Sequence, residues 1–384
     1  MLPVPYKIES FTDSSRNEYY LVIDTLFNGT SGGGIRIHDD VTLEEVTDLA
    51  KNMSFKFAIY DIPMGGAKIG IRLKDETIKR EALANLKEYL RPFIKSYLVF
   101  PGKDLGITEE EVALIYKKIL RQKHNSYSSY YTAVGLIACL NFIKSQYGLK
   151  DIKVALSGFG RVGYFLVKKL VEQGINLVAI SNKYGCIYKD NGLDKEELLK
   201  LREQFNNDEW IFHIKHKILS KEILYTLPVD ILIPGAEAYA INKKNINYLK
   251  TKFICPVANI TYHKDILSEL NRRRVIFFPD FVSNGGGALG SHLLSWGFSF
   301  KETERLVTSK ITKTLHFLYR NSKKNYYGFA LKLAEDKLKM RNELEEKFAR
   351  EKIFHLIRNY CRTLKNIFPR LLLRNYYTYI LKYL

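Results

Sequence analysis

Hydrophobic residues recur at two different spacings in the first third of the chain. Residues 18–27 are rich in β-branched and aromatic side chains, a composition that predicts a strand. Residues 42–57 carry apolar side chains three and four positions apart, which predicts a helix. Thr42 followed by Glu45 is the signature of a capping box at the start of that helix. Further helices are predicted over residues 78–97 and 108–120.

From residue 127 onward, short apolar strands alternate with helices, an order that predicts right-handed crossovers and a parallel sheet covered on both faces. The predicted elements are a helix at 133–147, a strand at 152–157, a helix at 161–173, a strand at 175–181 and later strands near 229–234, 253–258 and 274–278. The chain is therefore expected to be an α/β protein of two domains. Residues 1–126 form a mixed α/β domain, residues 127–298 form a Rossmann-type, doubly wound domain, residues 299–341 return as helices to the first domain, and residues 342–384 form a basic helical tail.

Composition assigns the chain to the globular class, because 46% of its 384 residues are hydrophobic and 26% are charged. The first residues lack the features of a signal peptide, and no stretch reaches the about 20 apolar residues of a membrane span. The cysteines form no CxxC pair and have no histidine at metal-ligand spacing, so we expect reduced thiols, a cytoplasmic protein and no metal site. They are Cys139, Cys186, Cys255 and Cys361.

The net charge of +19 suggests nucleic acid as a class of partner. Lysine and arginine are, however, spread along the whole chain without a dense basic tract. A lysine-rich surface is the favoured interpretation, and neither nucleic acid nor a membrane is an expected partner.

A glycine-rich turn follows the predicted strand at 152–157. Residues 153–163 read KVALSGFGRVG, in which Gly158, Gly160 and Gly163 have the spacing GxGxxG before a helix. The first glycine permits the tight turn, the second lets the backbone approach a pyrophosphate, and the third permits close packing of helix on strand. The N–H groups at the helix start would then face the phosphates of NAD or NADP. Candidate cofactor-binding residues here are Gly158, Phe159, Gly160, Arg161 and Val162.

The strand after this helix ends in Asn182, where an acidic residue that binds the ribose hydroxyls is expected. The missing carboxylate removes repulsion against a 2′-phosphate, and Lys183 could attract one. Asn182 is retained as a cofactor-binding candidate, and NAD and NADP both remain open.

Seven segments, in order along residues 18–340, resemble motifs of the glutamate/leucine/phenylalanine/valine dehydrogenase family. They are Gly33-Gly34-Ile35-Arg36, Met53-Ser54-Phe55-Lys56, Pro63-Met64-Gly65-Gly66-Ala67-Lys68, Pro101-Gly102-Lys103-Asp104-Leu105-Gly106, Thr132-Ala133-Val134-Gly135, Ala258-Asn259-Ile260-Thr261, and Pro279-Asp280 with Asn284-Gly285-Gly286-Gly287. The resemblance implies a first domain that carries the catalytic lysine and the oligomer interface, and a second domain that binds the dinucleotide. Substrate is then expected between them, with domain closure to exclude water.

The resemblance implies three chemical roles in the first domain. Lys68 is the candidate general acid/base, because a lysine in a closed apolar cleft near another cation loses its proton more readily. Lys56 is expected to hold the α-carboxylate of the substrate, and Asp104 to exchange protons with its nitrogen. Taken singly, each of the three is an ordinary surface or turn residue, and only the constellation indicates catalysis. Lys68 is expected in a glycine-rich turn.

The resemblance also places four residues near the cofactor. Thr132 and Asn259 are expected near the nicotinamide and its ribose, Ala236 beside the adenosine ribose, and Asn284 beside the nicotinamide amide. Asn284 is also compatible with a plain turn before three glycines. Gly34 and Ser291 are the further substrate-binding candidates.

Two departures from the family pattern bear on the substrate. Glutamate-type members carry a lysine just before the GGxR element, where this chain has Gly32, and a second buried carboxylate would lack compensation there. Ser291 points the other way, since it coincides with the serine that contacts that carboxylate in glutamate-type members, and Lys103 could supply a cation instead. Pro256, Val257 and Ile69 also differ from common members and reshape the cleft wall.

The predicted function is the reversible, NAD(P)-dependent oxidative deamination of an L-amino acid to a 2-oxo acid and ammonia by a homo-oligomer, with an apolar substrate slightly favoured over glutamate. The alternative is a catalytically silent family member that binds RNA or a protein partner, and the presence of Lys56, Lys68 and Asp104 argues against it. A third hypothesis, a Rossmann dehydrogenase of a hydroxy or imino compound, would not depend on ammonia.

Overall fold

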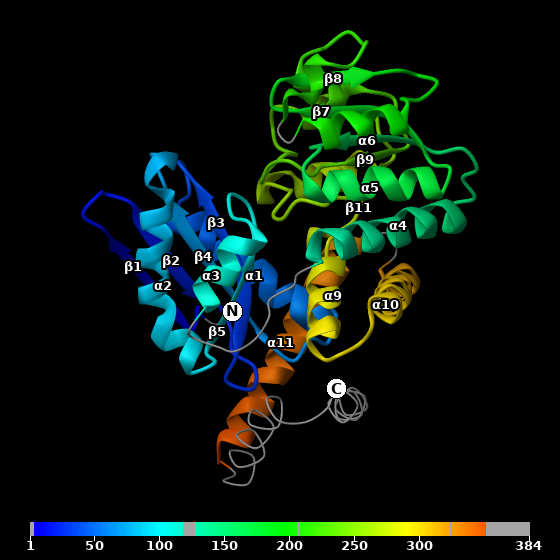
Figure 1. Ribbon diagram of the computed structural model, residues 1–384. Coiled ribbons are helices and arrows are strands. Elements are labelled where there is room, and N and C mark those ends of the chain that lie inside the picture. The colour runs from blue at the N-terminus through cyan, green and yellow to red at the C-terminus, as the bar shows by residue number, and fades with distance from the viewer. Residues whose placement is uncertain (1–3, 118–126, 206–207, 323–324, 351–384) are drawn as a thin grey trace. The chain divides into compact units, whose positions relative to one another are not determined.

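The computed structural model describes residues 4–117, 127–205, 208–322 and 325–350. The chain divides into two compact units, one of residues 1–126 with 333–384 and one of residues 127–332 (Figure 1). Most of the predicted basic tail, from residue 351 to 384, lies outside the described residues. Among the described residues, no helix combines the length and apolar character that crossing a membrane requires.

The first unit is built on a five-stranded sheet. Its elements are β1 (Lys7–Thr12), β2 (Glu18–Ile23), β3 (Ser31–His38), α1 (Leu43–Ile59), β4 (Gly65–Arg72), η1 (Glu76–Ile78), α2 (Lys79–Lys95), β5 (Val99–Lys103), α3 (Glu109–Tyr116) and the larger part of α11 (Tyr326–Arg350). The strand order is β1-β2-β4-β3-β5, with β3 parallel to both β4 and β5 and the other pairs antiparallel.

Helices cover both faces of this sheet. On one face, isoleucines of β3 and β4 form a core with Leu86 and Leu90 of α2 and Val112 of α3. On the other face, Val22 of β2 packs with Val46 of α1. Because side chains alternate along a strand, each residue of β4 belongs to one of these two faces.

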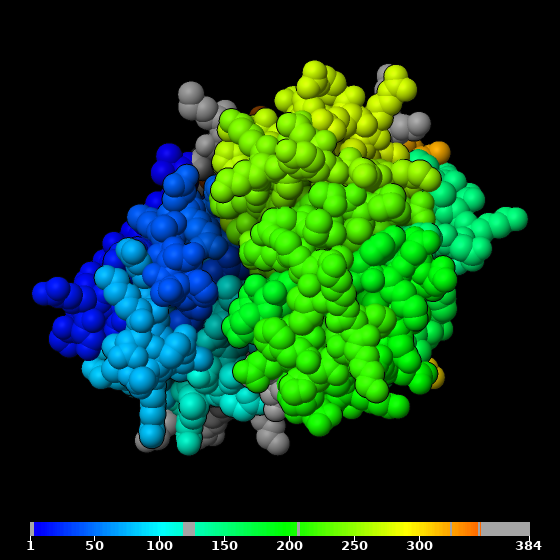
Figure 2. Space-filling model, turned by 90° about the horizontal axis from the view of Figure 1, so that it is seen from above, coloured from blue at the N-terminus to red at the C-terminus, as the bar shows by residue number. Residues whose placement is uncertain are grey.

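The second unit contains a six-stranded sheet. Its elements are α4 (Ser128–Gln146), β6 (Lys153–Ser157), α5 (Arg161–Glu172), β7 (Asn176–Asn182), β8 (Gly185–Tyr188), α6 (Lys195–Gln204), η2 (Asp208–Phe212), η3 (Lys221–Thr226), β9 (Ile231–Ile233), η4 (Ile246–Tyr248), β10 (Phe253–Ile254), η5 (Lys264–Ile266), α7 (Leu267–Arg272), β11 (Ile276–Phe277), α8 (Asp280–Ser283), α9 (Gly286–Ser295) and α10 (Phe300–Asn321). The strand order is β11-β10-β9-β6-β7-β8. In the space-filling view, the middle segments of this unit, coloured green, make up much of the face that is shown (Figure 2).

The order of these strands locates a binding crevice. Five strands are parallel and only β8 is antiparallel to its neighbour, so the sheet is Rossmann-like. The chain runs outward from β6 to β7 and then returns to β9 on the other side of β6. Such a reversal leaves a crevice at the carboxyl ends of the two strands where the direction changes, here β6 and β9.

The structure confirms the α/β class and most of the predicted elements. The strand over residues 18–23 and the helices over 43–59 and 79–95 form as predicted, and so does the strand–helix alternation from residue 127. The prediction missed β3 and β4, because both are rich in glycine, a residue depleted in strands. The helix predicted over 108–120 runs from Glu109 to Tyr116, and residues 118–120 lie outside the described part.

Helix α10 does not return to the first domain, although this was expected of residues 299–341. This helix belongs to the second unit, where it packs against α4 and α9, and only α11 from residue 333 onward joins the first unit. The reason is its apolar stripe, in which Val307, Ile311 and Leu315 are all fully buried.

Candidate active site

The register of the first sheet decides which way Lys68 points. Ala67 and Ile69 of β4 lie in the core on the α2 side. Lys68 therefore points to the opposite face, where α1 packs. Its neighbours on that face are Gly66 and Gly70, and any side chain there would collide with α1. The predicted glycine-rich turn around Lys68 is thus wrong: Lys68 lies within a buried strand against which α1 packs closely.

Three charged side chains meet on this face. Lys68 Nζ lies 2.6 Å from Asp104 Oδ2, and Arg36 Nε lies 2.9 Å from the same oxygen. The Lys68 side chain is 2% exposed and that of Asp104 is 19% exposed. Arg36 comes from β3 on the same face, and Asp104 directly follows β5. The structure therefore brings together the two predicted catalytic residues and adds an arginine for which no role was predicted.

Burial and charge act in opposite directions on this cluster. Burial of the ammonium lowers the pKa of Lys68, and the nearby Arg36 lowers it further, against the attraction of Asp104. Burial alone would raise the pKa of Asp104, but Lys68 and Arg36 outweigh it and hold that pKa well below its usual range. Asp104 is therefore ionised at neutral pH, and Lys68 releases its proton more easily than an exposed lysine.

Glu45 supports the cluster from the first turn of α1. The Thr42 hydroxyl accepts a hydrogen bond from the Glu45 N–H at 3.2 Å, which is one half of the predicted capping box. The Glu45 carboxylate does not complete the box, because it accepts a hydrogen bond from Arg36 instead. Arg36 thus links α1 to Asp104, and the motif Gly33-Gly34-Ile35-Arg36 was the only sequence signal for it.

Glycines of β3 bring the neighbouring strands and loops close to the cluster. A side-chain carbon at Gly34 would lie 2.7 Å from Asp104 Cβ and 3.0 Å from the Lys103 carbonyl oxygen. At Gly32, the same atom would lie 2.5 Å from the sulfur of Met64. The substrate-binding candidate Gly34 therefore lies directly against Asp104, and the position of Gly32 is covered by a thioether.

Lys56 lies in the last turn of α1, and its side chain is 5% exposed. Side chains of helix α11 bind the turn that follows α1. Arg341 donates hydrogen bonds to the carbonyl oxygens of Ile62 and Phe57 at 3.0 and 3.1 Å, and Lys337 lies 2.5 Å from Asp61. Burial lowers the pKa of Arg341 to about 10. These contacts join residues nearly 280 positions apart, and no sequence motif predicts them.

In the second unit, the glycine-rich turn follows the carboxyl end of β6 and contacts the residues that follow β9. Gly158 has a φ of +93°, a conformation that disfavours any side chain, and a side-chain carbon there would lie 3.2 Å from Ala236. Gly160 precedes α5 without a capping side chain, and no atom lies within 4 Å of where its side chain would begin. The space beside Gly160 at the start of α5 is therefore open, as the approach of a phosphate to the helix start requires.

The other residues of the predicted turn differ in exposure. Phe159 is 1% exposed, and its ring packs edge-on against Trp210 in the interior. Arg161 and Val162 open α5, and the side chain of Arg161 is exposed. Phe159 thus anchors the turn from inside, whereas Arg161 is at the surface beside it.

Asn284 and Asn259 form a second polar group in this unit. The Asn284 amide nitrogen donates hydrogen bonds to the Ala258 carbonyl oxygen at 3.0 Å and to Asn259 Oδ1 at 2.9 Å. These acceptors fix the orientation of the amide, and Asn284 Oδ1 is left buried without a hydrogen-bond partner among the described residues. Asp280 accepts a hydrogen bond from the N–H of Ile260, which holds the same loop. An acceptor of this kind fits an amide N–H of a ligand.

Thr132 lies in the first turns of α4, where its hydroxyl donates to the Ser128 carbonyl oxygen at 2.8 Å. A side-chain carbon at Gly287 would lie 2.4 Å from the same hydroxyl, so α4 and α9 approach closely at this point. Ser291 lies farther along α9 and is partly exposed.

Both polar atoms of the Asn182 side chain make hydrogen bonds within the second unit. Its side-chain nitrogen donates to the Asp208 carbonyl oxygen at 2.6 Å, and its oxygen accepts from the Tyr184 N–H at 2.9 Å. The side chain is 5% exposed. Its polar atoms therefore join the β7–β8 hairpin to η2 and do not face solvent.

The residues of the second unit fit a nicotinamide dinucleotide. The open helix start at Gly160 suits a pyrophosphate, and the unpartnered Asn284 oxygen suits a carboxamide. Bound there, such a group would supply the hydride acceptor or donor of a redox reaction.

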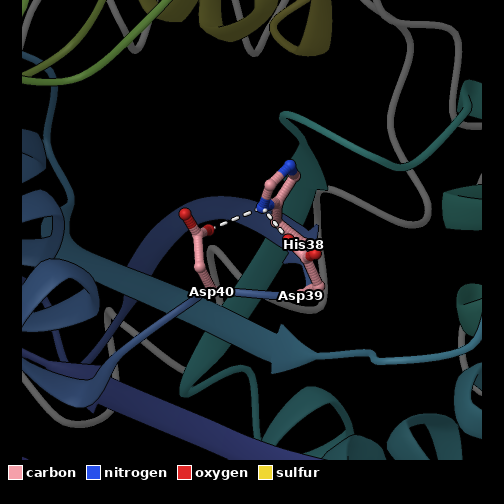
Figure 3. Close-up of side chains that lie close together, drawn as sticks. All are labelled: His38, Asp39 and Asp40. Atoms are coloured by element: carbon pink, nitrogen blue, oxygen red, sulfur yellow. Dashed lines mark hydrogen bonds and ion pairs between the residues drawn. The ribbon is translucent and has the colours of Figure 1, made fainter.

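Within the described residues, one group of histidine and carboxylate side chains lies close enough to share a cation. His38 Nδ1 is 2.7 Å from Asp39 Oδ1 and 2.5 Å from Asp40 Oδ1 at the end of β3 (Figure 3). All three side chains are exposed and bond to one another, so we assign no metal to this group.

Comparison with known proteins agrees with a two-domain dehydrogenase. The model of the Glutamate/Leucine/Phenylalanine/Valine dehydrogenase family matches residues 125–342, and that of the Glu/Leu/Phe/Val dehydrogenase dimerisation domain matches residues 13–121. The chain therefore belongs to the Glu/Leu/Phe/Val dehydrogenase family. It is an amino acid dehydrogenase by family, with NAD or NADP as the cofactor.

Two relatives show how far the sequence has diverged. A glutamate dehydrogenase of Thermotoga maritima is 29% identical over 296 residues, 71% of each chain. An NADP-specific glutamate dehydrogenase of Saccharolobus shibatae is 26% identical over 327 residues, 78% of this chain and 77% of that one.

Two solved structures share the fold. The hetero-hexameric glutamate dehydrogenase from Thermus thermophilus superimposes with a TM-score of 0.78 at 22% identity, over 89% of this chain and 90% of that one. The L-tryptophan dehydrogenase from Nostoc punctiforme gives a TM-score of 0.61 at 20% identity, over 88% and 97%. One fold thus serves a dicarboxylic and an aromatic substrate, so substrate must be argued from individual side chains.

Proposed function

We propose that this chain catalyses the reversible, NAD(P)-dependent oxidative deamination of an L-amino acid to a 2-oxo acid and ammonia. The observation that carries the proposal is the buried pair of Lys68 and Asp104, joined at 2.6 Å and backed by Arg36. A lysine whose pKa is lowered by burial can take a proton from an attacking water near neutral pH. Asp104 begins the cycle ionised and accepts a proton from the substrate ammonium.

Two further residues complete the proposed chemistry. Lys56, which is buried at the end of α1, would bind the α-carboxylate of the substrate. In the second unit, Asn284 would accept a hydrogen bond from the nicotinamide carboxamide through its unpartnered oxygen. Each role requires a polar atom held in a fixed orientation, which burial provides.

An apolar substrate is favoured over glutamate. A second substrate carboxylate needs a buried cation, and Gly32 supplies none. The Met64 sulfur covers position 32, so any protein side chain longer than that of glycine at this position would have to displace the sulfur. Ser291 and Lys103 are the residues through which glutamate would be bound instead. A preference for 2-oxoglutarate would favour the role of these two residues, and a preference for an apolar 2-oxo acid would favour the argument from Gly32.

We also propose a homo-oligomer in the cytoplasm. The match of residues 13–121 to a dimerisation domain supports assembly. The described cysteines, Cys139, Cys186 and Cys255, are buried free thiols, which is typical of proteins in a reducing compartment.

The test is absorbance at 340 nm with NADPH or NADH, ammonia and a panel of 2-oxo acids from 2-oxoglutarate to 4-methyl-2-oxopentanoate. We expect ammonia-dependent oxidation that is lost in Lys68→Ala and retained in Lys74→Ala, which removes an exposed lysine of the same unit. Equal activity of both variants would overturn the assignment of Lys68. Oxidation without ammonia would indicate a different dehydrogenase, and no turnover with intact nucleotide binding would support a silent family member.

A further inference from the structure

We propose that this chain selects NADP over NAD, and that Lys183 is the residue responsible. The inference rests on the proposed dehydrogenase function and concerns the adenosine end of the same nucleotide site.

The carboxyl end of β7 lies beside the glycine-rich turn. The N–H of Gly158 donates to the carbonyl oxygen of Ser181 at 2.8 Å, so the turn and the last residues of β7 are joined directly. In a Rossmann-like sheet, the residue at this end of the second strand faces the adenosine ribose of a dinucleotide whose pyrophosphate binds at the turn. Asn182 and Lys183 are therefore the residues of β7 and its hairpin that are placed to distinguish the two cofactors.

Selection of NAD at this position requires a free carboxylate, and β7 has none. Asn182 replaces it, and both polar atoms of Asn182 are engaged by the Asp208 carbonyl oxygen and the Tyr184 N–H. The Asn182 side chain is also uncharged and 5% exposed, so it offers no accessible carboxylate to the two ribose hydroxyls. The position therefore contributes neither the carboxylate that favours NAD nor the negative charge that repels a 2′-phosphate.

Two cations without a carboxylate partner among the described residues flank the turn. Lys183 is exposed at the tip of the β7–β8 hairpin, and its Nζ lies 4.9 Å from the centre of the Tyr184 ring. Arg161 is exposed at the first position of α5. A cation–π contact leaves the charge of Lys183 available for an anion. A phosphate dianion between these side chains would gain charge-assisted hydrogen bonds that a ribose hydroxyl cannot make.

The backbone of an acidic residue, Asp208, contacts Asn182, and the carboxylate of Asp208 is the alternative group that would serve NAD from outside β7. The experiment therefore changes Lys183 and Asp208 separately. Asn182→Asp is unsuitable, because it would place a carboxylate against the Asp208 carbonyl oxygen and so risk misfolding.

The experiment measures binding by calorimetry, without turnover. The full-length chain is titrated with NADP⁺ and NAD⁺, and with the fragments 2′,5′-ADP and 5′-AMP, which differ only by the 2′-phosphate. We expect wild type to bind the phosphorylated member of each pair at least tenfold more tightly. Lys183→Ala should reduce this ratio by about tenfold, and Lys183→Glu should reverse it. Lys150→Ala, which removes an exposed lysine preceding the amino end of β6, should leave the ratio unchanged.

The outcomes separate this inference from the proposed function. Binding of NAD⁺ as tight as that of NADP⁺ would overturn the inference and leave a dinucleotide-dependent dehydrogenase intact. The inference is also wrong if Asp208→Asn changes the ratio while Lys183→Ala does not. Absence of binding by either dinucleotide, in a folded protein, would overturn the proposed function itself.

Discussion

Arg36 and Asp104 should shift the titration of Lys68 in opposite directions. Arg36→Met removes a cation of similar length, and Asp104→Asn removes the anion while preserving shape. Lys68 must be neutral to act as a base, so activity at acidic pH is limited by the fraction of Lys68 that has lost its proton. Because Arg36 lowers the pKa of Lys68, its loss should raise that pKa; because Asp104 raises it, its loss should lower it.

The size of the shift follows from the geometry. Lys68 Nζ and Arg36 Nε lie 2.6 and 2.9 Å from one oxygen, so the two nitrogens are at most about 5.5 Å apart. At an effective dielectric constant of about 20, two unit charges at that distance repel by about 3 kcal/mol. At 1.36 kcal/mol per unit, this corresponds to about two pKa units. We expect the acidic limb of kcat/KM against pH to move by at least one unit to higher pH in Arg36→Met.

In Asp104→Asn, the same limb should move to lower pH, and kcat should fall by about 10²–10⁴ because a proton-transfer group is lost. Breaking a buried charge pair costs about 3–5 kcal/mol, and the 19% exposure of Asp104 places the expected loss of unfolding free energy near the lower value. Affinity for the dinucleotide serves as a control, since its candidate residues all lie in the second unit. Shifts of the same sign in both variants, or none, would refute the electrostatic account of Lys68.

Three further variants test other contacts. Gly34→Ala should lower kcat more than tenfold and reduce the free energy of unfolding in urea by about 1–3 kcal/mol, because the new atom lies 2.7 Å from Asp104 Cβ. Gly102→Ala is the control and should match wild type, because the nearest neighbour of its new atom is 3.8 Å away. Gly160→Ala should leave unfolding unchanged, because no atom lies within 4 Å, yet weaken dinucleotide binding at least tenfold in calorimetry. Arg341→Met should lower the midpoint of urea unfolding, with an expected loss of about 1–3 kcal/mol, since two buried carbonyl oxygens lose their donor; an unchanged midpoint would show that α11 is not required there.

The second unit was predictable because its signals are local. A strand, a GxGxxG turn and a helix follow one another within about twenty residues, and Gly158 and Gly160 occur where that pattern needs them. Asn182 shows where local inference ends. Its substitution for an acid was visible in the sequence, but its hydrogen bond to the Asp208 carbonyl oxygen, 26 residues away, depends on how a later segment folds back.

The first unit was predictable mainly through resemblance. Lys68 and Asp104 were assigned from motifs, and their separation of 36 residues gives no spacing rule that would pair them. The role of Arg36 depends on two partners outside its own strand, Asp104 and Glu45. Asp104 is 68 positions away, and Glu45 was expected to cap α1 instead. The contacts of α11 with the turn after α1 span a still larger separation, because they join residues 276 and 279 positions apart.

The glycines that lower the strand propensity of β4 also account for the burial of Lys68. Glycine weakens strand propensity, and β4 carries three glycines in eight residues. Two of them, Gly66 and Gly70, flank Lys68 on its own face, and the backbone of Ser54 and the side chain of Val46 occupy the space that their side chains would fill. Helix α1 can therefore lie directly on the sheet, and Lys68 is buried to 2% exposure. Since burial is the largest cause of the lowered pKa of Lys68, the glycines contribute to its reactivity without touching a substrate.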